Sequence, residues 1–309
     1  MKKVVALILS LTLLLTGLPG SALAQDGTTV AKQLSASDAW LGDTVTVTLT
    51  VNAAQAPVTV TDTLPAQFDY VPDTFMVDGA AVTPEVAGNS VSCELDTTGE
   101  HTIHFDIQMT TAEAETLTVS NIAEVGNATE TLATQSAEID IHPYSGFTKV
   151  VVDCTHDPWD SVPMGTDVHW FLLIEVENIA GDAIGIMEDV VVKDRFGGDL
   201  ELDDYDTGNG TVTIRETGCT EKVHLTWSEI AGLGQGDTVQ LSLEVSTDVN
   251  PGSNKNKDGK GRKNGHQEYT EEGEHCLNSG ALLKFVDAET GLKFSAHTPP
   301  IVVTAYAVE

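Results

Sequence analysis

Apolar and polar residues alternate with a period of two along much of this chain. Side chains on a β-strand point to opposite faces in turn, so this pattern is typical of strands with one buried face. No stretch after the first 24 residues has a sustained helical period, and only single helical turns are expected, at 111–114 and 228–231. The clearest strands are 44–51 (TVTVTLTV), 101–109 (HTIHFDIQM), 167–176 (DVHWFLLIEV) and 238–245 (TVQLSLEV). Many short strands between turn residues predict an all-β protein made of sandwiches.

Three polar residues fall on strand faces that the alternation assigns to the core. Asp62 lies in the apolar face of the strand predicted at 58–64, Asn121 in that of 117–125, and Lys32 among the apolar residues of the first strand. A lone buried carboxylate, amine or amide is costly, so these three residues are expected to meet in the core.

A second set of the same residue types follows in the same order, as Lys149, Asp194 and Asn278. A glycine turn also opens a strand at 42–45 and again at 165–168. The order of these landmarks is kept while their spacing grows, as insertions in the loops of a common scaffold would produce. The pattern predicts two copies of one β unit; the alternative is coincidence among similar β-rich segments.

The repeat gives a domain division. One sandwich is expected at 28–143 and a second at 146–309, joined by a hinge at 142–146 that is too short for free tumbling. Residues 252–265 form a Gly/Lys/Asn-rich insertion that holds five of the 15 basic residues. This basic loop is either a docking arm for an acidic partner, such as a neighbouring copy of the chain, or a solvated loop tip.

The start of the chain reads as a secretion signal at 1–24, with Lys2 and Lys3 before an apolar stretch and a small-residue cleavage site at 22–24. An uncleaved anchor is the alternative, although the apolar run is short for a spanning helix. The mature chain is therefore expected to be secreted, with no membrane insertion, and held at the cell surface through partners. Removal of the two lysines takes the net charge from −32 to −34. Such an acidic surface argues against nucleic acid and anionic membranes as partners and favours diffuse binding of divalent cations.

Four cysteines in an exported chain make a disulfide expected. Three of them, Cys154, Cys219 and Cys276, fall in the second half, so one bridge is expected there with a pairing that the sequence leaves open. Cys93 is expected to be a small buried hydrophobic residue.

Surface modification and metal binding have weaker signals. Asn127 and Asn209 begin Asn-x-Thr triplets that are compatible with glycosylation. Acidic residues crowd the segment 199–210, and Asp203, Asp204 and Asp206 are the calcium candidates, although the segment fails the EF-hand spacing. No other cofactor is expected.

Enzyme chemistry has little support in the sequence. His101 and His104 are three residues apart on a strand, so they face opposite sides. The chain has no CxxC motif, and its glycine-rich insertion does not follow the strand-to-helix pattern of a phosphate loop. We therefore expect a non-enzymatic protein.

Three features of the first half resemble a known family. They are the string 60–65 (VTDTLP) followed by 68–70 (FDY), a lysine near the first strand, and an Asn-Ile-Ala sequence in a late strand. They are similar to the isopeptide-forming Ig-like domains of bacterial pilins and adhesins, and to the related conserved-repeat domains of bacterial and archaeal surface proteins. The resemblance covers 28–143 well and 146–309 loosely, and it implies Ig-like folds for both sandwiches. It also implies that Lys32 is a nucleophile, Asn121 an acceptor with ammonia leaving, and Asp62 the acid that polarises the amide.

The second set departs from the family pattern, because Ser-Gly follows Asn278 and basic residues flank Asp194. In both sets the alternative to a covalent link is an uncrosslinked buried ion pair beside a hydrogen-bonded asparagine. If the first and last strands run parallel with Lys149 beside Asn278, Cys154 and Cys276 lie about seven residues apart in register, roughly 20 Å. A Cys154–Cys276 bridge and this link should therefore exclude one another.

These features together predict a secreted structural or adhesive cell-surface protein whose only chemistry is on itself. Its expected partners are other cell-surface or extracellular proteins, including further copies of itself. The alternative is an extracellular module that binds a glycan or a protein through loops at one end of a sandwich, without self-crosslinking.

Overall fold

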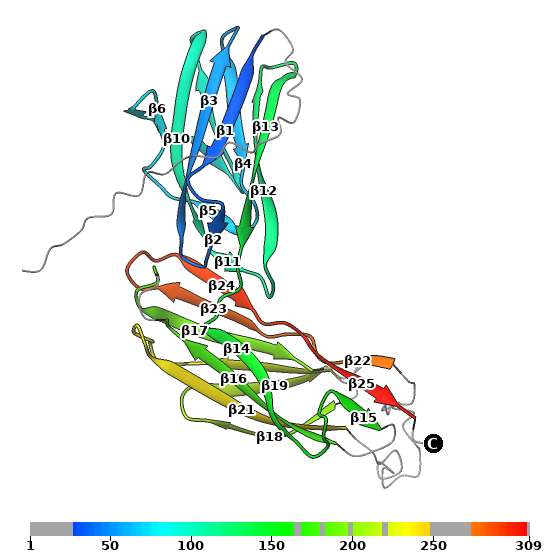
Figure 1. Cartoon of the computed structure of the whole chain (residues 1–309). Helices are drawn as coiled ribbons and strands as arrows, with labels where there is room; N and C mark the ends of the chain where they lie inside the picture. The colour runs from blue at the N-terminus through cyan, green and yellow to red at the C-terminus, as the bar shows by residue number, and fades with distance from the viewer. Residues whose placement is uncertain are drawn as a thin grey trace, which may run out of the picture.

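The computed structural model describes residues 27–163, 168–179, 183–196, 200–217, 222–247 and 273–307. Within these ranges the secondary structure consists of strands, as the alternation predicts. Figure 1 shows two β-sandwiches stacked end to end, the first in blue to green and the second in green to red. The expected signal at 1–24 and the basic loop at 252–265 lie outside the described residues.

The N-terminal sandwich has two facing six-stranded sheets. The first contains β1 (Thr29–Leu34), β3 (Thr44–Ala53), β10 (Gly99–Met109), β6 (Met76–Val77) and β7 (Ala80–Ala81), with β5 (Phe68–Tyr70) also paired to β10. The second contains, in spatial order, β2 (Asp38–Ala39), β13 (Thr131–Ile141), β12 (Leu117–Gly126), β4 (Val58–Thr63), β9 (Ser90–Leu95) and β8 (Glu85–Ala87).

The described strands of the C-terminal sandwich form three sheets. A six-stranded sheet contains β11 (Thr111–Ala112), β24 (Lys293–His297), β23 (Leu282–Asp287), β17 (Met187–Arg195), β20 (Lys222–Ser228) and β19 (Thr211–Thr217). A four-stranded sheet contains β14 (Phe147–Cys154), β16 (His169–Glu177), β21 (Thr238–Thr247) and β18 (Leu200–Thr207). A three-stranded sheet contains β15 (Ser161–Pro163), β25 (Ile301–Tyr306) and β22 (Gly273–Asn278).

Burial follows the alternation closely. Along β3, the valines and the leucine between Val45 and Val51 are buried, while the threonines between them are half-buried. On β10, His101 faces the core and His104 the opposite side, which confirms the predicted facing of this pair. Each sandwich therefore has its own apolar interior, and any polar residue on a core-facing position is enclosed by it.

The joint between the sandwiches differs from the sequence prediction. Residues 111–114 were expected to form a helical turn, but β11 is a strand that pairs parallel to β24 of the C-terminal sandwich. Ser295 N donates a hydrogen bond to Thr110 O at 2.9 Å. The expected turn at 228–231 is also wrong, because β20 runs to Ser228 and irregular backbone follows it. Residues 111–112 form a strand instead of a helical turn because the edge of β24 offers unpaired backbone groups to β11.

The hinge at 142–146 is also held in place. Tyr144 donates a hydrogen bond from its hydroxyl to Glu177 O at 2.7 Å. A Cβ added to Gly146 would lie 2.3 Å from that same carbonyl oxygen, so only glycine allows this approach. The division at 28–143 and 146–309 stays a prediction, although every sheet falls on one side of it apart from the contribution of β11.

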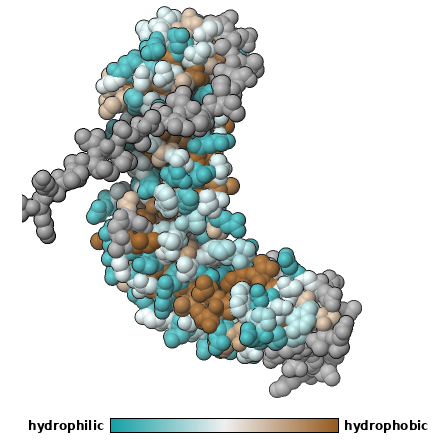
Figure 2. Space-filling model, viewed as in Figure 1, coloured by the Kyte–Doolittle hydropathy of each residue, from teal (hydrophilic) through white to brown (hydrophobic). Residues whose placement is uncertain are grey.

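The surface is mixed in polarity, with one brown apolar area over the C-terminal sandwich where β14 runs (Figure 2). Val150 and Val152 of β14 are 47% and 57% exposed, and β14 is an edge strand of its sheet. Among the described residues, we find no helix of the length and apolarity needed to cross a bilayer.

Candidate functional site

The structure brings Lys32, Asp62 and Asn121 together between the two sheets of the N-terminal sandwich. Lys32 comes from β1 of one sheet, whereas Asp62 on β4 and Asn121 on β12 come from the facing sheet. The lysine Nζ contacts both Asp62 Oδ2 and Asn121 Oδ1. The antiparallel register, in which Asp62 lies opposite Ala123 on β12, places the carboxyl and the amide next to one another.

This site is closed to water. The side chains of Lys32 and Asp62 are 0% and 2% exposed, and Asn121 is fully buried. Burial lowers the pKa of the Lys32 amine below its usual range, against the opposing effect of Asp62. Burial also raises the pKa of the Asp62 carboxyl, although the lysine works against this shift. Both shifts favour the neutral forms, an unprotonated amine beside a protonated acid.

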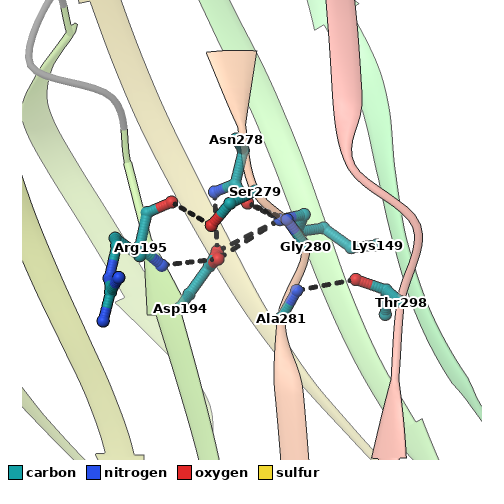
Figure 3. Close-up of polar contacts among 8 residues, drawn as sticks. All are labelled: Lys149, Asp194, Arg195, Asn278, Ser279, Gly280, Ala281 and Thr298. Atoms are coloured by element: carbon teal, nitrogen blue, oxygen red, sulfur yellow. Dashed lines mark hydrogen bonds and ion pairs between the residues drawn. The ribbon is translucent and has the colours of Figure 1, made fainter. Parts of the chain in front are cut away.

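The second set meets in the C-terminal sandwich, as Figure 3 shows. Lys149 on β14 reaches across to the amide oxygen of Asn278 at the end of β22. Its Nζ lies 3.3 Å and 3.4 Å from the two carboxylate oxygens of Asp194 on β17. The Asn278 Nδ2 donates to Asp194 Oδ2 at 3.0 Å, and Lys149 and Asp194 side chains are both 0% exposed. The same three residue types therefore form the same kind of buried group twice.

The Ser-Gly sequence after Asn278, a departure from the family pattern, has a structural role. Gly280 has a φ of +89°, and a Cβ there would lie 2.4 Å from Thr298 O. This turn lets Gly280 N donate to Asn278 Oδ1 at 2.9 Å. The amide oxygen of Asn278 therefore accepts from the backbone of this turn as well as from Lys149 (Figure 3).

Two properties of these groups matter chemically. Each places an amine against the side-chain amide of an asparagine, with a carboxyl group in contact with the amine. Each also joins separate sheets, so a bond between the lysine and the asparagine would tie two sheets of a sandwich together. Neutral amines are nucleophiles, and a fixed position beside the electrophile replaces the entropy cost of an encounter.

The cysteine prediction needs correction. Cys154 has a free, half-buried thiol, so the predicted bridges through Cys154 are not formed. Cys154 lies opposite Trp170 on β16, whereas Cys276 lies opposite Val302 on β25 of another sheet, and a Cys219–Cys276 bridge stays a prediction. Cys219 lies outside the described residues. Cys93 is also a free thiol, and burial raises its pKa to about 11.

The structure separates the three calcium candidates into different surroundings. Asp203 lies beside His169 and Glu244, whereas Asp204 and Asp206 line a neighbouring surface groove. Sequence reasoning missed His169 and Glu244, because both lie in ordinary alternating strands with no spacing signal.

The glycosylation candidates sit in turns. Asn127 Oδ1 accepts hydrogen bonds from Thr129 N at 2.9 Å and from Glu130 N at 3.0 Å. Asn209 O accepts a hydrogen bond from Trp227 Nε1 at 2.7 Å. Both asparagines are half-buried, and their modification stays a prediction.

Comparison with known proteins gives structural matches alone. No protein-family model matches the chain, and no curated protein matches it by sequence. The C-terminal domain of the antigen I/II polypeptide BspA of Streptococcus agalactiae is 9% identical, with a TM-score of 0.33, and the match covers 90% of this chain and 99% of that one. The Enterococcus faecalis MSCRAMM ACE, described as binding its ligands by the collagen hug model, is 14% identical at a TM-score of 0.28, over 90% and 95% of the two chains. The major pilin subunit BcpA of Bacillus cereus is 11% identical at a TM-score of 0.31, over 91% and 69%. These superpositions are loose, so the functional argument depends on the residues of this chain.

Proposed function

We propose that this chain is a secreted structural or adhesive subunit of a cell surface or extracellular assembly, with each sandwich braced by an internal Lys–Asn isopeptide bond. The observation that carries the proposal is the buried Lys–Asp–Asn group, which occurs once in each sandwich between separate sheets. A protein that bears load between its ends benefits from such links, because they hold the two layers together when the hydrogen-bonded ladders are strained.

The chemistry balances without a cofactor. The Lys32 Nζ attacks Asn121 Cγ, an Nζ–Cγ bond forms, and the Cγ–Nδ2 bond breaks with ammonia as the leaving group. Asp62 in its protonated form donates its proton to the amide, which polarises the amide and delivers that proton to the leaving nitrogen, and the resulting carboxylate takes one proton from the attacking nitrogen. Lys149, Asn278 and Asp194 follow the same steps. In the first group, burial shifts the pKa of Lys32 down and that of Asp62 up, toward the protonation states that the reaction needs, and in both groups folding supplies the proximity.

The assembly role is supported by the edge strand β14, whose exposed Val150 and Val152 offer backbone groups and apolar side chains to another copy. Sedimentation of the secreted protein over a range of concentrations tests this role. We expect large species for the wild-type chain and smaller ones for Val152→Lys, with Val86→Lys in the N-terminal sandwich as the matched control. A wild-type chain that stays monomeric at all concentrations would overturn the structural-subunit role.

A second candidate function is a binding module for an extracellular protein. It is supported by a groove of about 550 Å³ lined by apolar and polar side chains of the N-terminal sandwich, Asp69 and Asp73 among them, and by Leu292 of the β23–β24 turn. Tyr70, Pro72 and Pro84 give this groove flat apolar walls. A monomer that is retained on arrays of extracellular matrix proteins, and loses retention in Tyr70→Ala, would favour this function over the first. Retention on a glycan array would instead identify a sugar ligand.

A further inference from the structure

Three side chains of residue types that can bind metals converge on the outer face of the four-stranded sheet in the C-terminal sandwich. They are His169 on β16, Glu244 on β21 and Asp203 on β18, and their ligand atoms all lie within 4.8 Å of one another. The His169 Nδ1 is 3.1 Å from Glu244 Oε1 and 3.6 Å from Asp203 Oδ2. The three side chains are each about one third exposed, so the group opens to solvent.

The strand register explains why these residues meet. His169 and Glu244 alternate with buried residues on their strands, which puts both on the outer face. On β18 the register shifts between Leu202 and Asp204, and Asp203 is the extra residue of this β-bulge. A bulge turns a side chain away from its regular position, and here Asp203 is exposed together with Asp204 rather than directed to the core.

We propose that His169, Asp203 and Glu244 bind a first-row transition-metal dication, with Zn²⁺ as the best fit. Zinc binds imidazole nitrogen and carboxylate oxygen at about 2.0–2.2 Å, which separates two neighbouring ligand atoms in a tetrahedral site by about 3.3 Å. The two distances from His169 Nδ1 lie on either side of this value. Calcium is a poorer fit, because it takes six to eight oxygen ligands and disfavours nitrogen.

The charges also suit a dication. Two carboxylates point at one imidazole nitrogen in a chain with a net charge of −32. A bound dication neutralises both carboxylates at once, whereas a proton on the imidazole neutralises one. Three protein ligands leave at least one coordination position for water or for a side chain of a second molecule. Glu244 also borders a groove of about 310 Å³ that includes Val152 and Phe171, so this open position is accessible.

Titration calorimetry on tag-free secreted protein tests the site, with ZnCl₂ in the syringe and excess Ca²⁺ and Mg²⁺ in both solutions to occupy diffuse acidic sites. We expect one saturable Zn²⁺ site, and an affinity lower by at least about tenfold in each of His169→Ala and Glu244→Gln. His104→Ala removes an imidazole from the other sandwich and should bind as the wild-type chain does.

A second measurement locates the metal independently of affinity. Co²⁺ gives a visible absorption band when it is bound by nitrogen and oxygen in a low-coordinate site, and this band should be lost in His169→Ala and kept in His104→Ala. Both variants lie at the surface, and their far-ultraviolet circular dichroism verifies that they fold. Absence of saturable Zn²⁺ binding, or equal binding by wild-type and His169→Ala chains, would overturn the proposal.

Discussion

Replacement of Lys32 by methionine tests the covalent brace in the N-terminal sandwich. Methionine keeps much of the apolar volume of the lysine stem and removes the nucleophile. A bond between Lys32 and Asn121 closes a loop of 89 residues. If the loop entropy known for disulfides applies, its loss destabilises the sandwich by about 4.6 kcal/mol.

This free energy corresponds to a large change in melting temperature. The sandwich has about 115 residues. At about 2.1 cal/mol/K per residue, its total entropy of unfolding is roughly 0.24 kcal/mol/K. The predicted loss is therefore roughly 20 °C in Tm for this sandwich, measured by circular dichroism or calorimetry. Lys284→Met changes an exposed lysine and is the matched control, with an expected shift of a degree or two.

Part of any loss could come from the Asp62 carboxyl, which is left in the core without the lysine. The double variant Lys32→Met/Asp62→Leu removes that carboxyl as well. Most of the decrease in Tm should persist in the double variant, because loop closure is still lost. Full recovery of the wild-type Tm by the double variant, or an unchanged Tm in Lys32→Met, would refute the covalent brace and leave a buried ion pair in its place.

Three further outcomes are expected. Gly280→Ala strains a backbone at φ +89° and places a methyl group 2.4 Å from Thr298 O. Mass spectrometry should therefore show incomplete cross-linking in the C-terminal sandwich. Complete cross-linking would contradict the role of the turn. The hydrogen bond to Asp78 raises the pKa of His101. This pair therefore adds stability that is fully present below the unfolded-state pKa of about 6.5 and is lost as pH rises through the higher folded-state pKa. His101→Gln should flatten that part of the Tm–pH profile, and an unchanged profile would contradict the assignment. Burial raises the pKa of Cys93 to about 11, so iodoacetamide at pH 8 should alkylate Cys93 in the folded chain at least about a hundredfold more slowly than in the unfolded chain, and equal rates would contradict its burial.

The sequence predicts the core groups because their physical signal is local. Lys32 and Asp62 interrupt apolar alternation within single strands, and a polar residue on such a face must find partners in the core. The same reasoning locates Lys149 and Asp194, although 129 residues separate Lys149 from Asn278, against 89 between Lys32 and Asn121. Asn278 was predicted from the repeated order of the residue types, because alternation defines only which side of a strand is buried.

Features that depend on register between distant strands could not be predicted in this way. Residues 111–112 are too short to show a period, and their pairing depends on the free edge of β24, about 180 residues further along the chain. The cluster around His169 needs three neighbouring strands and a one-residue bulge before Asp203 joins it. The error with Cys154 has the same origin, because a disulfide requires two strands to be in a register that spacing does not reveal.

Intact mass spectrometry of the folded chain tests the central claim most directly. Each Lys–Asn bond releases one ammonia, so the account predicts a mass about 34 Da below that of the unmodified chain, and a deficit of about 17 Da in Lys32→Met relative to its own calculated mass. A folded wild-type chain with its full unmodified mass would contradict the cross-links in both sandwiches.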